Sequence, residues 1–280
     1  MPYVTPLTIT GAVLALTATG DALDWRLLIT IFANILAVAY AFMINDVVDA
    51  PDDALEAHRA ARNPVTSGEL TPREGWVISL VVGAAALILY ALVNTEVLII
   101  GVITLILSHL YSWKPVRLKA YPITDVVSHS LMLSGLLYLA GYYAYHNSLG
   151  EAWLVFAALV LISVYGQLYN QLRDFNMDKA AGLHNTAIMV GEKLTTVLMY
   201  LAVLAAVAAF IVAIVVGVLP LWVVLFAVAG MALTIYFIRS SQDSRGGQAA
   251  DFSGNIQLQI LLVANALNIV WLLVIVLGNR

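Results

Sequence analysis

The chain has 280 residues, of which 62% are hydrophobic and 11% are charged, and its mean hydropathy is +0.92. Soluble domains carry about 25% charged residues, so this composition excludes an ordinary soluble domain and a disordered chain. The 13 Lys and Arg residues are too few for a nucleic-acid-binding protein. Cysteine is absent, which excludes disulfides, thiolate metal sites and cysteine nucleophiles. The first ten residues carry no basic segment, so we expect no cleavable leader.

Continuous apolar stretches recur along the chain with about the 20-residue length that crosses a bilayer. Nine spans are expected, over residues 3–20, 27–45, 75–94, 96–112, 122–145, 152–171, 194–217, 219–238 and 257–278. Uninterrupted apolar runs exclude a membrane β-barrel, in which apolar and polar residues alternate. The sequence therefore predicts an all-α, polytopic membrane helical bundle of about nine transmembrane helices, formed by a single domain over residues 1–280.

Basic residues are distributed unevenly between the two sets of loops. The loops after the second, fourth, sixth and eighth spans hold 11 of them: Arg59, Arg62, Arg73, Lys114, Arg117, Lys119, Arg173, Lys179, Lys193, Arg239 and Arg245. The other side holds only Arg26 and Arg280. Because cytoplasmic loops carry the excess of Lys and Arg, we expect an integral protein of the cell membrane with a cytoplasmic N-terminus and an external C-terminus.

Two of the expected spans end in spaced aspartates. Asp46, Asp49 and Asp53 follow the second span at helical positions i, i+3 and i+7, and Asp174 and Asp178 follow the sixth at i and i+4. Like charges on one helical face repel, and at a helix C-terminus they also oppose the helix dipole. A divalent cation offsets both costs, and Mg²⁺ prefers carboxylate and phosphate oxygens.

Further polar residues accompany these acids at the expected cytoplasmic face. Asn45 and Asn170 are additional candidate ligands or donors close to an aspartate, and Arg62, Lys114, Arg117 and Lys119 are candidate diphosphate-binding cations. Carboxylates and basic donors together suit a diphosphate substrate. The positive-inside distribution alone also explains any single Lys or Arg here.

Four motifs in chain order carry a resemblance to a known family. Asn45-Asp46-x-x-Asp49-x-x-x-Asp53 resembles the first aspartate-rich motif of the UbiA superfamily of intramembrane prenyltransferases, and Asp174-x-x-x-Asp178-x-x-x-Gly182 resembles the second. The segments 62–68 and 111–119 resemble the stretches that follow the first motif and the fourth span. The chain departs from the family pattern in having no Arg near its start and in placing Asn63 between Arg62 and Pro64.

The resemblance implies a reaction and a site. An allylic prenyl diphosphate would bind with two Mg²⁺ ions between the motifs, ionise, and prenylate a lipophilic acceptor inside the membrane. Asp46, Asp49, Asp53, Asp174 and Asp178 would be the metal-binding and catalytic residues. The substrate-binding residues would be Asn45, Arg62, Tyr111, Lys114, Arg117, Lys119 and Asn170. The partners would be the prenyl diphosphate, the acceptor and membrane lipid; the sequence indicates no nucleic-acid or protein partner.

The acceptor stays open at this point. The segments 170–175 and 62–65 resemble the lycopene-elongase branch, which adds C5 units to a carotenoid. A geranylgeranylglyceryl phosphate or a quinone precursor is the alternative, and a cation-coupled transporter is a second alternative because acids within membranes often mark ion paths. Asp125 and His129, one turn apart in the fifth span, are candidates for handling a proton or for packing.

Overall fold

The computed structural model describes residues 3–55, 57–180, 182–238, 241–243 and 247–278. Within these residues the secondary structure is helical apart from one isolated bridge between Gln242 and Gln248. Arg239, Arg245 and Arg280, which enter the count of basic residues, lie outside the described residues.

Six of the described helices are long and apolar enough to cross a membrane. They are α2 (Arg26–Asp53), α4 (Pro72–Val93), α5 (Thr95–Ser112), α8 (Trp153–Arg173), α11 (Glu192–Val215) and α14 (Gln257–Gly278). Two shorter apolar helices, α1 (Val4–Thr19) and α12 (Leu221–Phe237), join them. The remaining expected span consists of α6 (Thr124–Ser130), a π-helical segment η2 (Leu131–Gly135) and α7 (Leu136–Tyr143). The predicted bundle of about nine membrane helices is thus confirmed.

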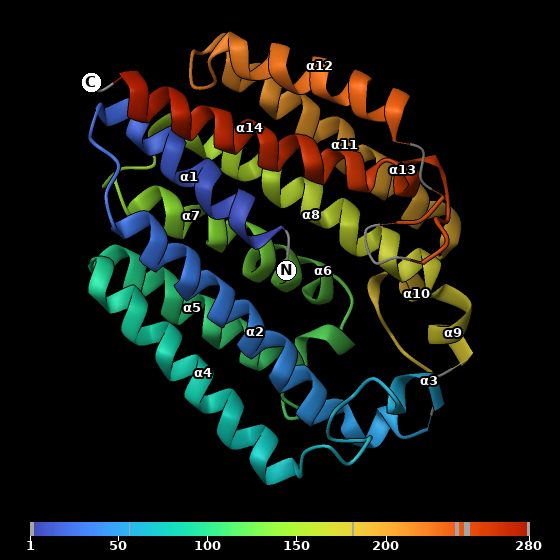
Figure 1. Cartoon of the computed structure of the whole chain (residues 1–280). Coiled ribbons are helices and arrows are strands. Elements are labelled where there is room, and N and C mark those ends of the chain that lie inside the picture. The colour runs from blue at the N-terminus through green and yellow to red at the C-terminus, as the bar shows by residue number, and fades with distance from the viewer. Residues whose placement is uncertain (1–2, 56, 181, 239–240, 244–246, 279–280) are drawn as a thin grey trace.

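Short helices connect the long ones. They are α3 (Ala57–Ala60), η1 (Leu118–Ala120), η3 (Gly150–Ala152), α9 (Phe175–Ala180), α10 (Thr186–Val190) and α13 (Phe252–Asn255). Figure 1 shows α3 and α9 side by side at one end of the bundle, beyond the ends of α2 and α8. The two predicted acidic segments therefore lie at the same end.

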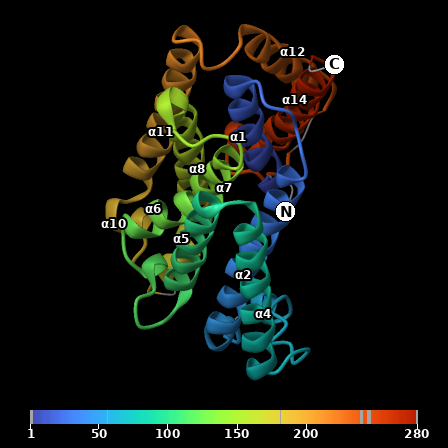
Figure 2. The ribbon, with the colours of Figure 1, turned by 90° about the vertical axis from the view of Figure 1, so that its left-hand side faces the viewer.

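The long helices form two groups with α1 and α7 between them (Figures 1 and 2). In one group α2 packs against α4 and α5, and in the other α8 packs against α11 and α12 packs against α14. Helix α1 contacts both groups, because it packs on α7, α2 and α14.

Glycines and one asparagine join the helices at the centre of the bundle. A Cβ atom on Gly11 would lie 2.2 Å from the Tyr138 carbonyl oxygen, and one on Gly141 would lie 2.0 Å from the Thr8 carbonyl oxygen, so α1 and α7 cross at backbone contact. Asn34 Nδ2 donates to Thr8 Oγ1 at 2.7 Å and to the Leu137 carbonyl at 3.0 Å. These contacts tie α2 to α1 and α7 with polar groups that are satisfied within the bundle.

Candidate active site

Helix α2 carries the first acidic motif because it continues past its apolar part to Asp53. The expected span ends at residue 45, but two further helical turns follow it, with Pro51 inside the helix. Helical spacing then places Asp46, Asp49 and Asp53 on one face, as the sequence pattern predicts. The three carboxylates would repel each other without a compensating charge.

Asn63 fixes the last aspartate of this motif. Its side-chain amide donates to Asp53 Oδ2 and to the Asp46 carbonyl oxygen, both at 2.8 Å. Its own Oδ1 accepts the backbone N–H of Val65 at 2.9 Å, and the side chain is 3% exposed. Asn63, which departs from the family pattern, thus ties the loop after α3 to the end of α2. This role was not predicted from the sequence.

Two cations from the loop after α5 reach the same face. Lys119 Nζ donates to Asn45 Oδ1 at 2.7 Å and to Asp49 Oδ2. Arg117 Nη2 donates to Asp52 Oδ2 at 2.7 Å and to Asp49 Oδ1 at 3.3 Å. Arg117 has a left-handed backbone with φ 43°, which is costly for a residue with a Cβ. Burial lowers the pKa of the Lys119 ammonium, and the Asp49 carboxylate acts in the opposite direction.

Lys114 and Arg62 are more exposed than Arg117 and Lys119. Lys114 is half exposed, and its Nζ lies 3.9 Å from Asp52 Oδ1. Arg62 is exposed beside the buried Asn63. Asn45 Oδ1 accepts two hydrogen bonds, one from Lys119 Nζ and one from Ser112 Oγ at 2.9 Å.

The second acidic motif lies where α8 passes into the short helix α9. Asp174 contacts the preceding Arg173, whose Nε lies 3.1 Å from Asp174 Oδ1 and whose Nη1 lies 2.7 Å from Asp243 Oδ2. One turn later the buried Asp178 accepts a hydrogen bond from Asn185 Nδ2 at 2.8 Å. The last aspartate of each motif is thus held by an asparagine that follows it in the chain.

Asp125 lies at the start of α6 and is 1% exposed. Its Oδ2 accepts Gln171 Nε2 at 2.7 Å and the Thr186 N–H at 2.8 Å, and its Oδ1 accepts the Thr186 hydroxyl. Both carboxylate oxygens therefore accept hydrogen bonds from donors on α6, α8 and α10. His129 packs near Tyr111, with ring centroids 6.2 Å apart.

The other predicted substrate-binding residues lie near the ends of α5 and α8. Tyr111 Oη accepts Gln167 Nε2 at a long 3.5 Å. Asn170 is half-buried on α8, one turn before Asp174. These residues border the acidic end of the bundle.

The loops of the two motifs meet at this end. Arg59 Nη2 on α3 contacts Met177 Sδ on α9 at 3.9 Å. Within the described part of the chain, no three Asp, Glu or His side chains converge closely enough to hold a metal ion. The oxygen donors suit Mg²⁺, but a cation would need additional ligands such as phosphate oxygens between the motifs. The donor set therefore fits a metal that is shared with a phosphorylated substrate.

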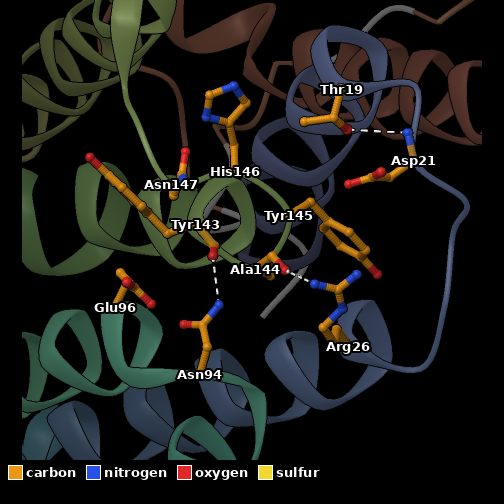
Figure 3. Close-up of a pocket in the computed structure, with 10 residues that line it drawn as sticks. All are labelled: Thr19, Asp21, Arg26, Asn94, Glu96, Tyr143, Ala144, Tyr145, His146 and Asn147. Atoms are coloured by element: carbon orange, nitrogen blue, oxygen red, sulfur yellow. Dashed lines mark hydrogen bonds between the residues drawn. The ribbon is translucent and has the colours of Figure 1, made fainter.

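A pocket of about 350 Å³ lies at the opposite end of the bundle (Figure 3). There Asn94 Nδ2 donates to the Tyr143 carbonyl and Arg26 Nη1 donates to the Ala144 carbonyl, both at 2.8 Å. Asp21 and Glu96 also line it. Because two acids line this pocket and its Arg26 already donates to a backbone carbonyl, the pocket does not suit a diphosphate. It is also separate from both acidic motifs.

Comparison with known proteins identifies the class to which the chain belongs. The model of the UbiA prenyltransferase family matches residues 4–276, so the chain belongs to this family. Among solved structures, a UbiA homologue from Aeropyrum pernix has a TM-score of 0.76 at 22% identity and 96% coverage of both chains. A UbiA homologue from Archaeoglobus fulgidus bound to GPP and Mg²⁺ has a TM-score of 0.73 at 21% identity and 98% coverage of both. The fold is thus that of UbiA proteins, and the chain is an integral membrane protein.

Curated relatives match part of the chain. Digeranylgeranylglyceryl phosphate synthase of Methanopyrus kandleri is 29% identical over 182 residues, which are 65% of this chain and 64% of that protein. 4-Hydroxybenzoate octaprenyltransferase of Pseudomonas aeruginosa is 30% identical over 171 residues, which are 60% of this chain and 55% of that protein. The chain spans less than two thirds of the length of these relatives.

Proposed function

We propose that the protein transfers a prenyl group from an allylic prenyl diphosphate to an acceptor that carries an anionic group. The observation that carries this proposal is the presence of two acidic helix ends at one end of the bundle, one of them faced by Arg117 and Lys119. Carboxylates alone would repel a diphosphate, and cations alone would bind many anions. Their combination favours a diphosphate that arrives with divalent metal.

The residues divide into two groups in this proposal. Asp46 and Asp53 on α2, with Asp174 and Asp178 across the site, would hold Mg²⁺ ions that the diphosphate also ligates. A divalent cation bound there neutralises the diphosphate and makes it a better leaving group. Asp49 is engaged by both cations, so its role would be to position Arg117 and Lys119 for the phosphate oxygens, with direct metal ligation as the alternative.

The bond changes follow from this arrangement. The bond between the allylic carbon and the diphosphate oxygen breaks, and its electron pair leaves with the diphosphate. The acceptor supplies the electron pair of the new bond from an oxygen or a carbon and then loses a proton. The apolar interior of the bundle would shelter the prenyl chain and exclude water from the allylic cation. Arg117 and Lys119 would stabilise the charge on the departing diphosphate.

The choice of acceptor follows the relatives and the position of Arg62. One of the curated relatives is named for a glyceryl phosphate product and the other for a hydroxybenzoate substrate. Both compounds are anionic. Arg62, a candidate from the sequence for binding the diphosphate, is exposed beside Asn63. In this proposal it would bind the anionic group of the acceptor instead. These relatives favour a geranylgeranylglyceryl phosphate or a quinone precursor, and the carotenoid acceptor expected from the sequence has no comparable support. A transporter is disfavoured because the acids lie at helix ends.

The membrane orientation is part of the proposal. The basic residues of the loops that carry both acidic motifs favour a cytoplasmic position for this end of the bundle. A soluble prenyl diphosphate would then enter from the cytoplasm, while the acceptor would enter from the bilayer.

A panel of acceptors tests the proposal. Purified protein is incubated with Mg²⁺, a labelled prenyl diphosphate, and geranylgeranylglyceryl phosphate, 4-hydroxybenzoate or lycopene in separate reactions. Product should form with one of the two anionic acceptors. Arg62→Ala should raise the KM for that acceptor more than the KM for the prenyl diphosphate. Product with lycopene alone would overturn the anionic assignment and leave prenyl transfer intact.

A further inference from the structure

We propose that Asp125 is a positioning residue for the second acidic motif. Its carboxylate would fix α10 and the end of α8. In that position Asp174, which directly precedes α9, and Asp178, within α9, would meet the metal and diphosphate of the substrate. This inference rests on the proposed function, because it assigns a purpose to Asp125 only if the second motif binds that group.

The first observation is that both oxygens of Asp125 are filled. Four donors surround the carboxylate: the Val126 N–H at 2.8 Å, Gln171 Nε2 at 2.7 Å, the Thr186 N–H at 2.8 Å and the Thr186 hydroxyl. An ionised carboxylate has about four acceptor sites. With these four donors in place, the carboxylate can anchor the segments that supply them.

The second observation is that these donors form a closed ring across three helices. Gln171 on α8 donates to Asp125, while its Oε1 accepts the N–H of Ala187 on α10 at 3.0 Å. Thr186 Oγ1 also accepts the Ile123 N–H at 2.7 Å, which ties α10 to the segment that precedes α6. Loss of one member would leave buried polar groups without partners, and the ring would loosen as a unit.

The third observation is that residues of this ring, or next to it, flank α9. Helix α9 has six residues, of which only Phe175 and Asp178 are buried. Gln171 lies three residues before Asp174, and Asn185, next to Thr186, donates to Asp178 Oδ2. Both ends of the acidic segment are therefore attached to residues that Asp125 fixes, while its middle has little packing of its own.

Threonine substitutions separate positioning from general stability. Thr186→Val removes one donor to Asp125, and Thr186→Ser keeps it. The matched control is Thr8→Val, because Thr8 is also fully buried and hydrogen-bonded, to Asn34 and the Val4 carbonyl, but it lies in the network at the centre of the bundle. Gln171→Met is a second variant, which removes two hydrogen bonds of the ring without changing charge.

Two readouts are compared: the Mg²⁺ concentration for half-maximal prenyl transfer, and Mn²⁺ binding by electron paramagnetic resonance with a prenyl thiolodiphosphate. Thr186→Val and Gln171→Met should raise both half-saturation values about 10- to 100-fold. Thr186→Ser should keep both values near those of the wild type. Thr8→Val should also leave them unchanged, although it loses about as much thermal stability as Thr186→Val. At saturating metal, Asp125→Asn should reach most of the wild-type kcat. If Asp125 transferred a proton, the kcat of this variant would stay low at any metal concentration.

The outcomes distinguish this inference from the proposed function. If the wild-type protein needs no divalent cation, the proposed function fails. If the wild type needs the cation but Thr186→Val shifts metal binding no more than Thr8→Val does, the positioning role of Asp125 is overturned and the proposed function stands.

Discussion

Asn63 and Asn185 hold the last aspartates of the two acidic motifs in the same way. Each side-chain amide donates to one carboxylate oxygen at 2.8 Å, Asn63 to Asp53 and Asn185 to Asp178. Each Oδ1 accepts a backbone N–H at 2.9 Å, from Val65 in the loop after α3 and from Ile188 in the first turn of α10 respectively. One oxygen of each aspartate is thereby fixed, and the carboxylate keeps a single orientation toward the site.

This shared arrangement predicts equal sensitivity at two distant positions. Asn63→Ala and Asn185→Ala should each lower metal affinity or activity about 10- to 100-fold, because residues that orient metal ligands typically contribute this much. Asn147→Ala, at an exposed position near the opposite end of the bundle, is the matched control. Metal titrations of prenyl transfer would measure the effect. If either variant behaves like Asn147→Ala, that asparagine does not orient its aspartate for catalysis.

Lys119 should act mainly on the binding of the diphosphate. Lys119→Met removes a charge that contacts Asn45 and Asp49, so the KM for the prenyl diphosphate should rise at least about 10-fold, or about 1.4 kcal/mol. Lys193→Met, at an exposed position, is the control for the loss of one positive charge. Initial rates over a range of prenyl diphosphate concentrations give the KM. An unchanged KM in Lys119→Met would show that the cation serves only to balance Asp49.

The crossing of α1 and α7 predicts a large difference between two identical substitutions. Gly141→Ala places a methyl group against the Thr8 carbonyl and should cost at least about 1–3 kcal/mol of stability, as overpacking does. Gly166→Ala, in the middle of α8, meets no neighbouring atom within 4 Å and should be neutral or slightly stabilising. Thermal unfolding in detergent measures both. Equal melting temperatures would contradict the close contact between the two helices.

The proposed orientation is testable because the chain has no cysteine. Ser67→Cys lies in the exposed part of the loop after α3, and Asn147→Cys lies in the loop before α8 at the other end. An impermeant maleimide should label position 147 in intact cells and position 67 only after the membrane is opened. Labelling of position 67 from outside intact cells would reverse the orientation.

Much of the fold was predictable because each membrane helix depends on local composition. The apolar stretches predict the nine spans, although α2 runs two turns beyond its predicted end. Those turns mix spaced acids with Val47 and Val48, which lowers their hydropathy, so hydropathy does not register them. Similarly, the expected span over 122–145 contains the π-helical segment Leu131–Gly135, which apolar composition does not distinguish from regular helix.

The acidic positions of the candidate site were accessible from helical spacing, but their supports were not. Asn63 and Asp53 are ten residues apart, and Asp125 and Thr186 are 61 apart. Such contacts depend on how helices pack, which periodicity within one helix does not reveal. One signal was present: Asn63 interrupts the expected Arg-Pro pair beside the acidic motif.

The central claim is that both acidic motifs act together on a metal-bound prenyl diphosphate. The most direct measurement is the release of diphosphate and the formation of prenylated acceptor by purified wild-type protein, with Mg²⁺ and with EDTA, beside Asp46→Asn and Asp174→Asn. We expect turnover by the wild type with Mg²⁺, no turnover in EDTA, and no turnover in either variant although both remain folded. Turnover that persists in EDTA, or in either folded variant, would contradict the account.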